Sequence, residues 1–157
     1  MKRWEDVIKS LTIDRVAPGA DPDLSVLCEP ADTEGYSFVS RAATEWADRT
    51  NRFDGPGEGF LIAHLGKELV GMCGLNIDPF LSDPRVGRLR HLYVDPAQRR
   101  RGIAARLVFA CLDLASDSFD RVRLRTYDPT AIEFYLATGF APVAEPSATH
   151  TTTIGPR

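Results

Sequence analysis

The chain has 157 residues, 43% of them apolar and 26% charged, and its net charge is −3. This composition predicts one soluble globular domain over residues 1–157, and it argues against a strongly basic nucleic-acid-binding protein. No apolar run is long enough to cross a bilayer, which excludes a membrane-spanning helix.

The cysteines and histidines show no pattern of a disulfide framework or a metal site. Cys28, Cys73 and Cys111 are odd in number and widely spaced, which is typical of reduced thiols. The histidines lack metal-ligand spacing. The first ten residues carry acids where a signal peptide would be apolar. We therefore expect a cytoplasmic protein with no metal ion, no membrane partner and no nucleic-acid partner.

The first half of the chain predicts a strand, a helix and a hairpin, in that order. The strand is expected over 10–17 and the helix over 30–53. Apolar residues recur at helical spacing in the second of these segments, at Tyr36, Val39, Ala43, Trp46 and Ala47. After a loop rich in Gly and Pro at 54–59, the apolar runs FLIAHL and LVGMCGLNI are joined by GKE, which predicts a hairpin.

The second half predicts alternating strands and helices. Strands are expected over 88–94 and 121–127, with a helix over 101–115 between them. A second helix follows, which Asp128 would cap and Gly139 would end. Two last strands are expected at FAPVAE and THTTTI. The order predicts a mixed sheet flanked by helices, in the α+β class.

The strand over 88–94 has apolar and aromatic side chains in alternation. This alternation is expected to place Leu89, His91 and Tyr93 on one face and Leu92 and Val94 on the other.

A run of three arginines, Arg99 to Arg101, lies where a helix is expected to begin. Cations are unfavourable there, because a helix N-terminus is itself partly positive. The N–H groups of the first turn have no partner inside the helix and can bind an anion. Gly102 and the small Ala104 would let a phosphate approach the backbone. The run therefore indicates either a phosphate site or a solvated basic turn.

Two segments of the second half resemble signatures of the GCN5-related N-acetyltransferase (GNAT) family. LYVDPAQRRRGIAARLV resembles the family's acetyl-CoA signature, with matches at Val94, Pro96, Arg99, Gly102 and Ala104. DPTAIEFYLATGF resembles the second signature, with matches at Ala131, Phe134, Tyr135, Gly139 and Phe140. Asp128 stands where that signature has Asn. The resemblance implies a GNAT-like acyl-CoA N-acyltransferase fold, with a mixed, largely antiparallel sheet of six to seven strands and about four helices.

The resemblance also implies acetyl-CoA as the cofactor. The coenzyme A pyrophosphate would rest on the backbone N–H groups of residues 100–105. The pantetheine arm would run beside residues 92–94, where this strand and the strand over 121–127 would splay apart, so that the cofactor pairs with the exposed edge. The implied cofactor-binding residues are Leu92, Tyr93, Val94, Arg99, Arg100, Arg101, Gly102, Ile103, Ala104, Ala105, Asp128, Phe134 and Tyr135.

The implied reaction is acyl transfer from a thioester to an amine, which needs an acid, an oxyanion donor and a proton acceptor. Tyr135 matches the family's usual general acid, and the Val94 N–H is the favoured oxyanion donor. Where some members have a glutamate base, this chain has Arg88, so His91 on the same strand is the candidate base. The loop acids Glu58 and Asp78 are expected at the surface.

The sequence leaves open which molecule accepts the acetyl group. The primary amine of a small molecule is the first hypothesis, because Asp54 and Glu58 would suit a cationic amine. A protein or peptide N-terminus, or a lysine, is the second. A non-catalytic acyl-CoA-binding module is the third, which the loss of the strand glutamate favours. Dimers are frequent in the family, so a homodimer is open as well.

Overall fold

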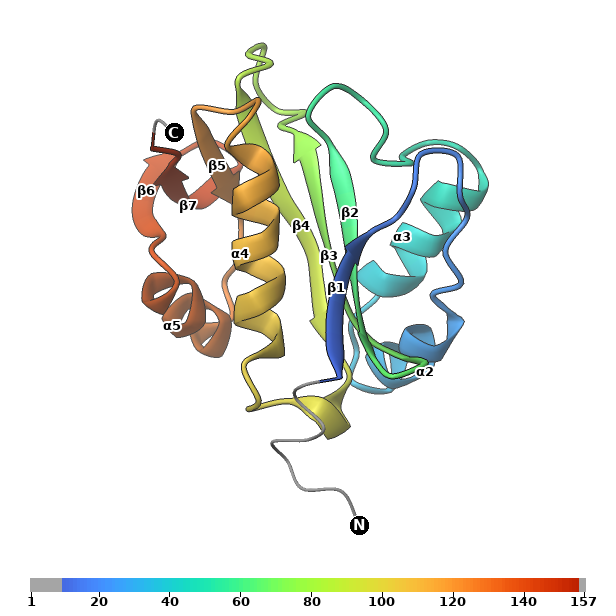
Figure 1. The fold of residues 1–157 in the computed structure, drawn as a ribbon. Coiled ribbons are helices and arrows are strands. Elements are labelled where there is room, and N and C mark those ends of the chain that lie inside the picture. Colours follow the sequence, from blue (N-terminus) through green and yellow to red (C-terminus); the bar gives the residue numbers. More distant parts are fainter. Residues whose placement is uncertain (1–9, 156–157) are drawn as a thin grey trace.

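The computed structural model describes residues 10–155, which form one seven-stranded sheet with helices on both faces (Figure 1). The strand order is β1-β2-β3-β4-β5-β7-β6, and each neighbouring pair is antiparallel except β4 and β5. The predicted mixed, largely antiparallel sheet is confirmed. The elements are β1 (Leu11–Arg15), α2 (Ser25–Thr33), α3 (Phe38–Ala47), β2 (Gly59–Leu65), β3 (Glu68–Ile77), β4 (Val86–Val94), the 3-10 helix η1 (Pro96–Gln98), α4 (Ile103–Ala115), β5 (Arg121–Leu124), α5 (Pro129–Ala137), β6 (Ala141–Glu145) and β7 (Ala148–Thr153).

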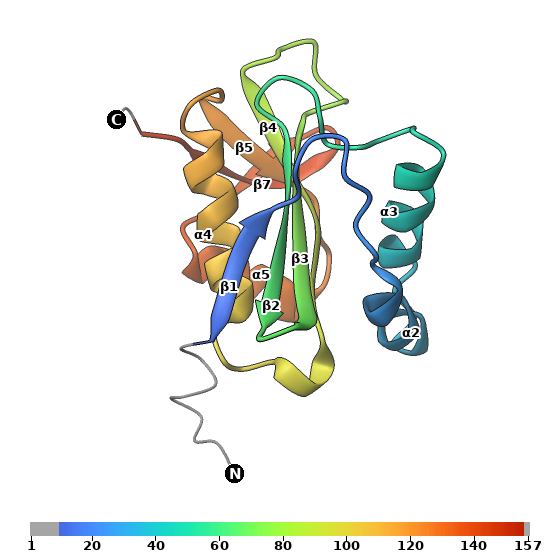
Figure 2. The ribbon, with the colours of Figure 1, turned by 45° about the vertical axis from the view of Figure 1, so that its right-hand side comes forward.

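The helices lie in two layers, one on each face of the sheet (Figure 2). α4 packs on β2, β3 and β4, over a core that includes the fully buried Leu75, Leu107 and Cys111. α2 and α3 cover the opposite face, where Trp46 and Phe60 are buried. None of the helices within residues 10–155 combines the length and the apolar character that crossing a membrane requires.

The prediction of a single helix over 30–53 is wrong, because two helices, α2 and α3, occupy this part of the chain. The break comes at Gly35, whose φ of +86° belongs to the left-handed region that ends helices. The next N–H, that of Tyr36, donates to the Ala31 carbonyl oxygen at 2.9 Å and closes α2. The buried side chains of α3 are Val39, Ala42 and Trp46.

β4 does not alternate as expected, because a bulge interrupts it at His91. The φ of His91 is +60°, and the β3–β4 register shifts between Met72 and Gly74. One extra residue reverses the faces beyond it, so Leu89 packs under α4 whereas Tyr93 packs under α2 and α3. The prediction that Leu89, His91 and Tyr93 share a face is therefore wrong.

Other local predictions are confirmed. β2 and β3 form the expected hairpin. The Asp128 carboxylate accepts the Thr130 N–H at 3.1 Å and caps α5, and Gly139, with φ of +104°, lies just past the helix end. β5 is shorter than expected, because it ends at Leu124 and residues 125–127 leave the sheet.

The prediction that Asp78 lies at the surface is wrong. Its side chain is buried, accepts a hydrogen bond from Arg123 Nε at 2.8 Å and lies 3.4 Å from Arg88 Nη1. Both arginines are buried as well, on the neighbouring strands β4 and β5. Two guanidinium groups out of water need a carboxylate, and the loop after β3 supplies it.

The substitution Asp78→Asn is expected to lower the free energy of unfolding by about 3–5 kcal/mol, because it leaves buried Arg88 without a carboxylate and Arg123 with only Glu145, 3.6 Å away. Denaturant unfolding followed by circular dichroism measures the loss. Asp120→Asn is the control, since Asp120 makes an exposed ion pair with Arg85, which water screens and which adds little to stability. Equal losses in the two variants would contradict the structural role of Asp78.

Candidate active site

The candidate site lies where β4 and β5 separate (Figure 1). The two strands pair only over residues 86–88 and 121–123, after which β4 continues to Val94. No strand of residues 10–155 pairs with this edge of β4 beyond Arg88. The separation agrees with the splay that the family resemblance implies. Backbone groups of β4 are left available to an extended ligand, which would add to the edge as a strand does.

At the end of this edge, Val94 points its backbone N–H into the gap. The N–H of Asp95 donates to the Val70 carbonyl oxygen on β3 at 2.8 Å. Because bonding directions alternate along a strand, the N–H and C=O of Val94 face away from β3. The Val94 carbonyl oxygen accepts a hydrogen bond from Arg99 Nε at 3.1 Å. The Val94 N–H is therefore placed to meet an oxygen of a ligand in the gap.

The turn before α4 presents further N–H groups. Gly102 has φ of +77°, and Arg100 is also left-handed, with φ of +63°. The N–H of Arg106 is the first to bond within the helix, to the Gly102 carbonyl oxygen at 3.1 Å. The preceding N–H groups, those of residues 102–105, have no partner inside the helix. A Cβ at Gly102 would meet no atom within 4 Å, so an anion can approach this backbone closely.

A cavity of about 800 Å³, which we call the cofactor cavity, joins the open β4 edge to the start of α4 and to α5. The predicted cofactor-binding residues that line it are Leu92, Tyr93, Val94, Arg99, Arg100, Ala104, Asp128, Phe134 and Tyr135. Arg101, Gly102, Ile103 and Ala105 are not among its lining residues. The side chain of Ile103 is buried in the core beneath α4, so only its backbone N–H is available to a ligand.

A carboxylate that sequence analysis missed holds Arg99. Glu34, at the end of α2, accepts hydrogen bonds from both terminal nitrogens of Arg99 at 2.7 Å and from the Tyr93 hydroxyl at 2.6 Å. The hydrogen bonds from Arg99 lower the pKa of Glu34. No sequence pattern links Glu34 to Arg99, because α2 reaches the site only through the tertiary fold. Arg99 is thus preordered at the cavity wall beside Tyr93.

Tyr135, the expected general acid, has its ring between two others. The ring centroids of Phe134 and Phe140 lie 5.2 Å and 5.5 Å from that of Tyr135. Burial raises the pKa of the Tyr135 hydroxyl far above its ordinary value, so the phenol stays protonated at neutral pH. No hydrogen bond within residues 10–155 contributes to this pKa. The hydroxyl can therefore donate to a ligand in the cavity.

His91, the expected base, is not among the lining residues of the cofactor cavity. Its ring stacks on Phe38 at 6.3 Å and meets the edge of Phe53 at 6.0 Å. Its Nε2 is buried and has no hydrogen-bond partner in the described part of the chain. Burial, with the charges of Arg90 and Arg41, lowers the pKa of His91 to about 4. The imidazole is therefore neutral at pH 7 and a weak proton acceptor.

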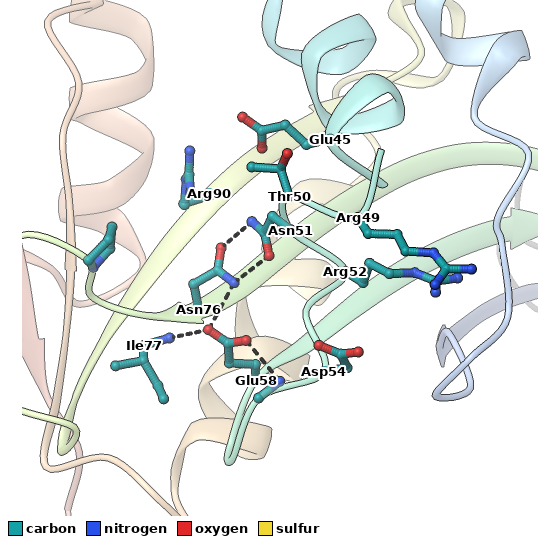
Figure 3. Close-up of a pocket in the computed structure, with 12 residues that line it drawn as sticks. Glu45, Arg49, Thr50, Asn51, Arg52, Asp54, Glu58, Asn76, Ile77 and Arg90 are labelled. Carbon is teal, nitrogen blue, oxygen red and sulfur yellow. Dashed lines mark hydrogen bonds between the residues drawn. The ribbon is translucent and has the colours of Figure 1, made fainter. Parts of the chain in front are cut away.

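A second cavity, of about 370 Å³, lies on the α3 side of the sheet, and we call it the polar cavity (Figure 3). It is built by the end of α3, the loop that follows, the end of β3 and one residue of β4. Its lining residues are Glu45, Arg49, Thr50, Asn51, Arg52, Asp54, Gly55, Glu58, Asn76, Ile77, Pro79 and Arg90.

A closed hydrogen-bond network forms part of the wall of the polar cavity (Figure 3). Asn51 and Asn76 exchange two side-chain hydrogen bonds of 2.9 Å and 3.0 Å. Glu58 accepts hydrogen bonds from Asn76 Nδ2, Ile77 N–H and Gly55 N–H at 3.0, 2.8 and 2.9 Å. The expectation that Glu58 is a plain surface acid is therefore wrong. Sequence analysis missed this network, although Asn76 is the one polar side chain in the run LVGMCGLNI.

Comparison with protein families is consistent with this geometry. Residues 25–140 match the model of the acetyltransferase (GNAT) family. The match covers both the α2–α3 layer and the segment that carries the cofactor cavity. No curated protein sequence matches the chain.

Solved structures with the same fold are numerous, and three illustrate the range. A protein from Exiguobacterium sp. 255-15, assigned as an acetyltransferase, is 28% identical, with a TM-score of 0.78 over 91% of this chain and 93% of its own. A GNAT-family acetyltransferase from Staphylococcus aureus Mu50 is 16% identical, with a TM-score of 0.70 over 92% and 99%. A Salmonella typhimurium protein, assigned as an acetyltransferase and solved with its cofactor acetyl-CoA, is 11% identical, with a TM-score of 0.68 over 94% and 96%.

The substitution Gly102→Ala is expected to weaken the binding of coenzyme A by roughly tenfold or more, about 1.4 kcal/mol, because a methyl group would fill the space at the open N–H groups. Isothermal titration calorimetry measures the affinity. Gly66→Ala is the matched control, since Gly66 also has a positive φ and open space, but lies in the β2–β3 turn. Both variants should lose stability, whereas affinity should fall only for Gly102→Ala. Unchanged affinity would contradict an anion site at this turn.

The stability of the protein is expected to fall as the pH drops from about 6.5 to about 4, because of His91. In the unfolded chain the imidazole takes up a proton below its ordinary pKa of 6.5, whereas folded His91 does so only near pH 4. The unfolded state then binds more protons and is favoured in this window. Thermal melts of the wild type and of His91→Phe across the window test this, and parallel curves would contradict it.

Proposed function

The chain belongs to the acetyltransferase (GNAT) family, which makes it an acetyl-CoA-dependent acyltransferase, and from this premise we propose that it acetylates the primary amine of a small molecule. Acetyl-CoA supplies the acyl group as an activated thioester. The observation that carries the proposal is the cofactor cavity, in which an unpaired strand edge meets the N–H groups of a helix start. These two features fit the two parts of coenzyme A, an amide-containing arm and a pyrophosphate.

Backbone groups would hold most of the cofactor. The N–H groups of residues 102–105 would bind the pyrophosphate, and Arg100, which lines the cavity, would add its charge. The open edge of β4 near Leu92 and Val94 would pair with the amides of the pantetheine arm. Arg99 is already bound to Glu34, so its role would be to shape the wall at Tyr93 and to hold the Val94 carbonyl.

Two groups at the open edge would serve the acyl transfer. The Val94 N–H faces the gap and would donate to the thioester oxygen, where negative charge develops. Tyr135 lines the same cavity, and its hydroxyl would give its proton to the departing sulfur. A module that only binds acyl-CoA would need neither, so their presence in one cavity favours an enzyme over the binding module.

The side chain that was expected to remove the amine's proton is not suited to this step. His91 has a pKa of about 4 and does not line the cofactor cavity, so it is poorly suited to take this proton directly. We propose instead that the amine loses its proton to water before attack. The rate should then rise with pH as the fraction of unprotonated amine grows.

The substitution Tyr135→Phe is expected to lower kcat by about 10²–10⁴-fold while the affinity for acetyl-CoA is retained, because the phenyl ring keeps the packing and loses only the donor. Thiol release in the presence of a panel of primary amines measures turnover, and calorimetry measures cofactor affinity. A variant with full turnover would contradict the acid role of Tyr135. A wild-type protein that binds acetyl-CoA and transfers nothing would favour the binding module.

A further inference from the structure

Most charged groups that line the polar cavity are engaged or exposed. Glu58 already accepts three hydrogen bonds. Arg52 forms an ion pair with Asp21. Arg49 and Asp54 are solvent-exposed. Glu45 and Arg90 remain as half-buried charges that make no ion pair within residues 10–155.

Two cations of this cavity are half-buried, Arg52, which is paired, and Arg90, which lies one residue before the bulge in β4. In the part of the chain that the structure describes, its guanidinium makes no ion pair, not even with Glu45, which lines the same cavity (Figure 3). A partly desolvated charge without a partner is unfavourable, and a ligand that supplies the opposite charge would relieve the cost. The planar fork of a guanidinium matches a carboxylate in shape.

Arg90 also lies next to the place of the proposed acyl transfer. Leu92 lies two residues further along β4, beyond the bulge, at most about 7 Å away along the chain, and it lines the cofactor cavity. Phe38, whose ring stacks on His91, lines the same cavity. The polar cavity and the cofactor cavity therefore approach each other on β4 at His91, between the rings of Phe38 and Phe53. A carboxylate on Arg90 would therefore place the acceptor at the junction of the two cavities.

The charges around this junction favour an anion as well. Burial lowers the pKa of His91 most, and the nearby charges of Arg90 and Arg41 lower it further, so both arginines lie near the junction. Arg125, on the far side of the gap, lines the cofactor cavity. The neutral imidazole of His91 adds no charge of its own. These three arginines favour an acceptor with a carboxylate close to its amine over a cationic diamine.

We propose that the acceptor is a free α-amino acid whose carboxylate is bound by Arg90. The inference rests on the proposed function and narrows its acceptor. It replaces the expectation of a cationic amine, because that expectation relied on Asp54, which is exposed, and on Glu58, whose oxygens are occupied. In the reaction the amine nitrogen bonds to the acetyl carbon and the carbon–sulfur bond breaks. The amine loses one proton and the departing sulfur gains one.

The first test compares acceptors on the wild-type protein. Each of the twenty common amino acids is offered with acetyl-CoA beside its own α-carboxamide, and mass spectrometry counts the acetylated products. The amide has the same side chain and an amine that loses its proton more readily, so intrinsic reactivity favours the amide. We expect at least one amino acid to exceed its amide roughly tenfold or more in kcat/KM. A general preference for amides would point to peptide N-termini and overturn the proposal.

The second test asks whether Arg90 carries that preference. For the preferred amino acid, Arg90→Gln should raise KM roughly tenfold to a hundredfold with little change in kcat, because it removes a binding contact. Arg90→Lys should recover part of the affinity, since it keeps the charge without the fork. The kcat/KM for the matching amide should not change. An equal loss on amino acid and amide would mean a structural role and overturn the proposal.

Two controls separate this inference from the proposed function. Arg85→Gln removes an exposed arginine that pairs with Asp120, and it should leave the preference for the amino acid intact. In thermal melts, acetyl-CoA should raise the unfolding midpoint of the wild type and of the Arg90→Gln and Arg85→Gln variants. No rise in the wild type would overturn the proposed function itself. A rise without acetylation of any amino acid would overturn only the assignment of the acceptor.

Discussion

The separation of β4 from β5 is the constraint on which the site depends. In a continuous sheet, the backbone of β4 near Val94 would be paired on both sides and closed to a ligand. Pairing stops after Arg88, and β5 ends at Leu124, so the edge is exposed within the molecule rather than at the rim of the sheet. The same gap receives the start of α4 and the ring of Tyr135. One irregularity of the sheet thus brings the proposed anion site, oxyanion donor and general acid into a single cavity.

The arginines of this chain differ in role according to the carboxylate that each one meets. Arg123 and Arg88 share Asp78 and are locked into the sheet. Arg99 is held by Glu34 at the wall of the cofactor cavity, partly open to water. Arg90 meets no carboxylate of the described chain, although it is half buried. Because desolvated charges need partners, this last arginine is the one that points to a ligand.

Much of the fold and part of the site could be predicted from local patterns. The β2–β3 hairpin, the cap of α5 by Asp128 and the turn at Gly139 follow from residue preferences that act over a few positions. The candidate anion site was predicted for a similar reason. The N–H groups in the first turn of any helix lack a partner inside the helix, and the arginine run marks such a turn. The face assignment of β4 failed at His91, because a bulge depends on the neighbouring strand and not on the alternation within β4.

The sequence by itself determined where most helices and strands form, apart from the split into α2 and α3. It also determined which backbone turn presents N–H groups without a partner inside the helix. Both depend on contacts between near neighbours in the chain. Only the tertiary structure decided which charges are paired. Glu34 at the end of α2 binds Arg99, which is distant in the sequence. Asp78 binds an arginine on each of two strands, and Glu58 accepts hydrogen bonds from backbone N–H groups. A carboxylate looks the same in a sequence whether it is solvated, buried or bound. Its partner is set by packing between distant segments, and that packing leaves Arg90 without one.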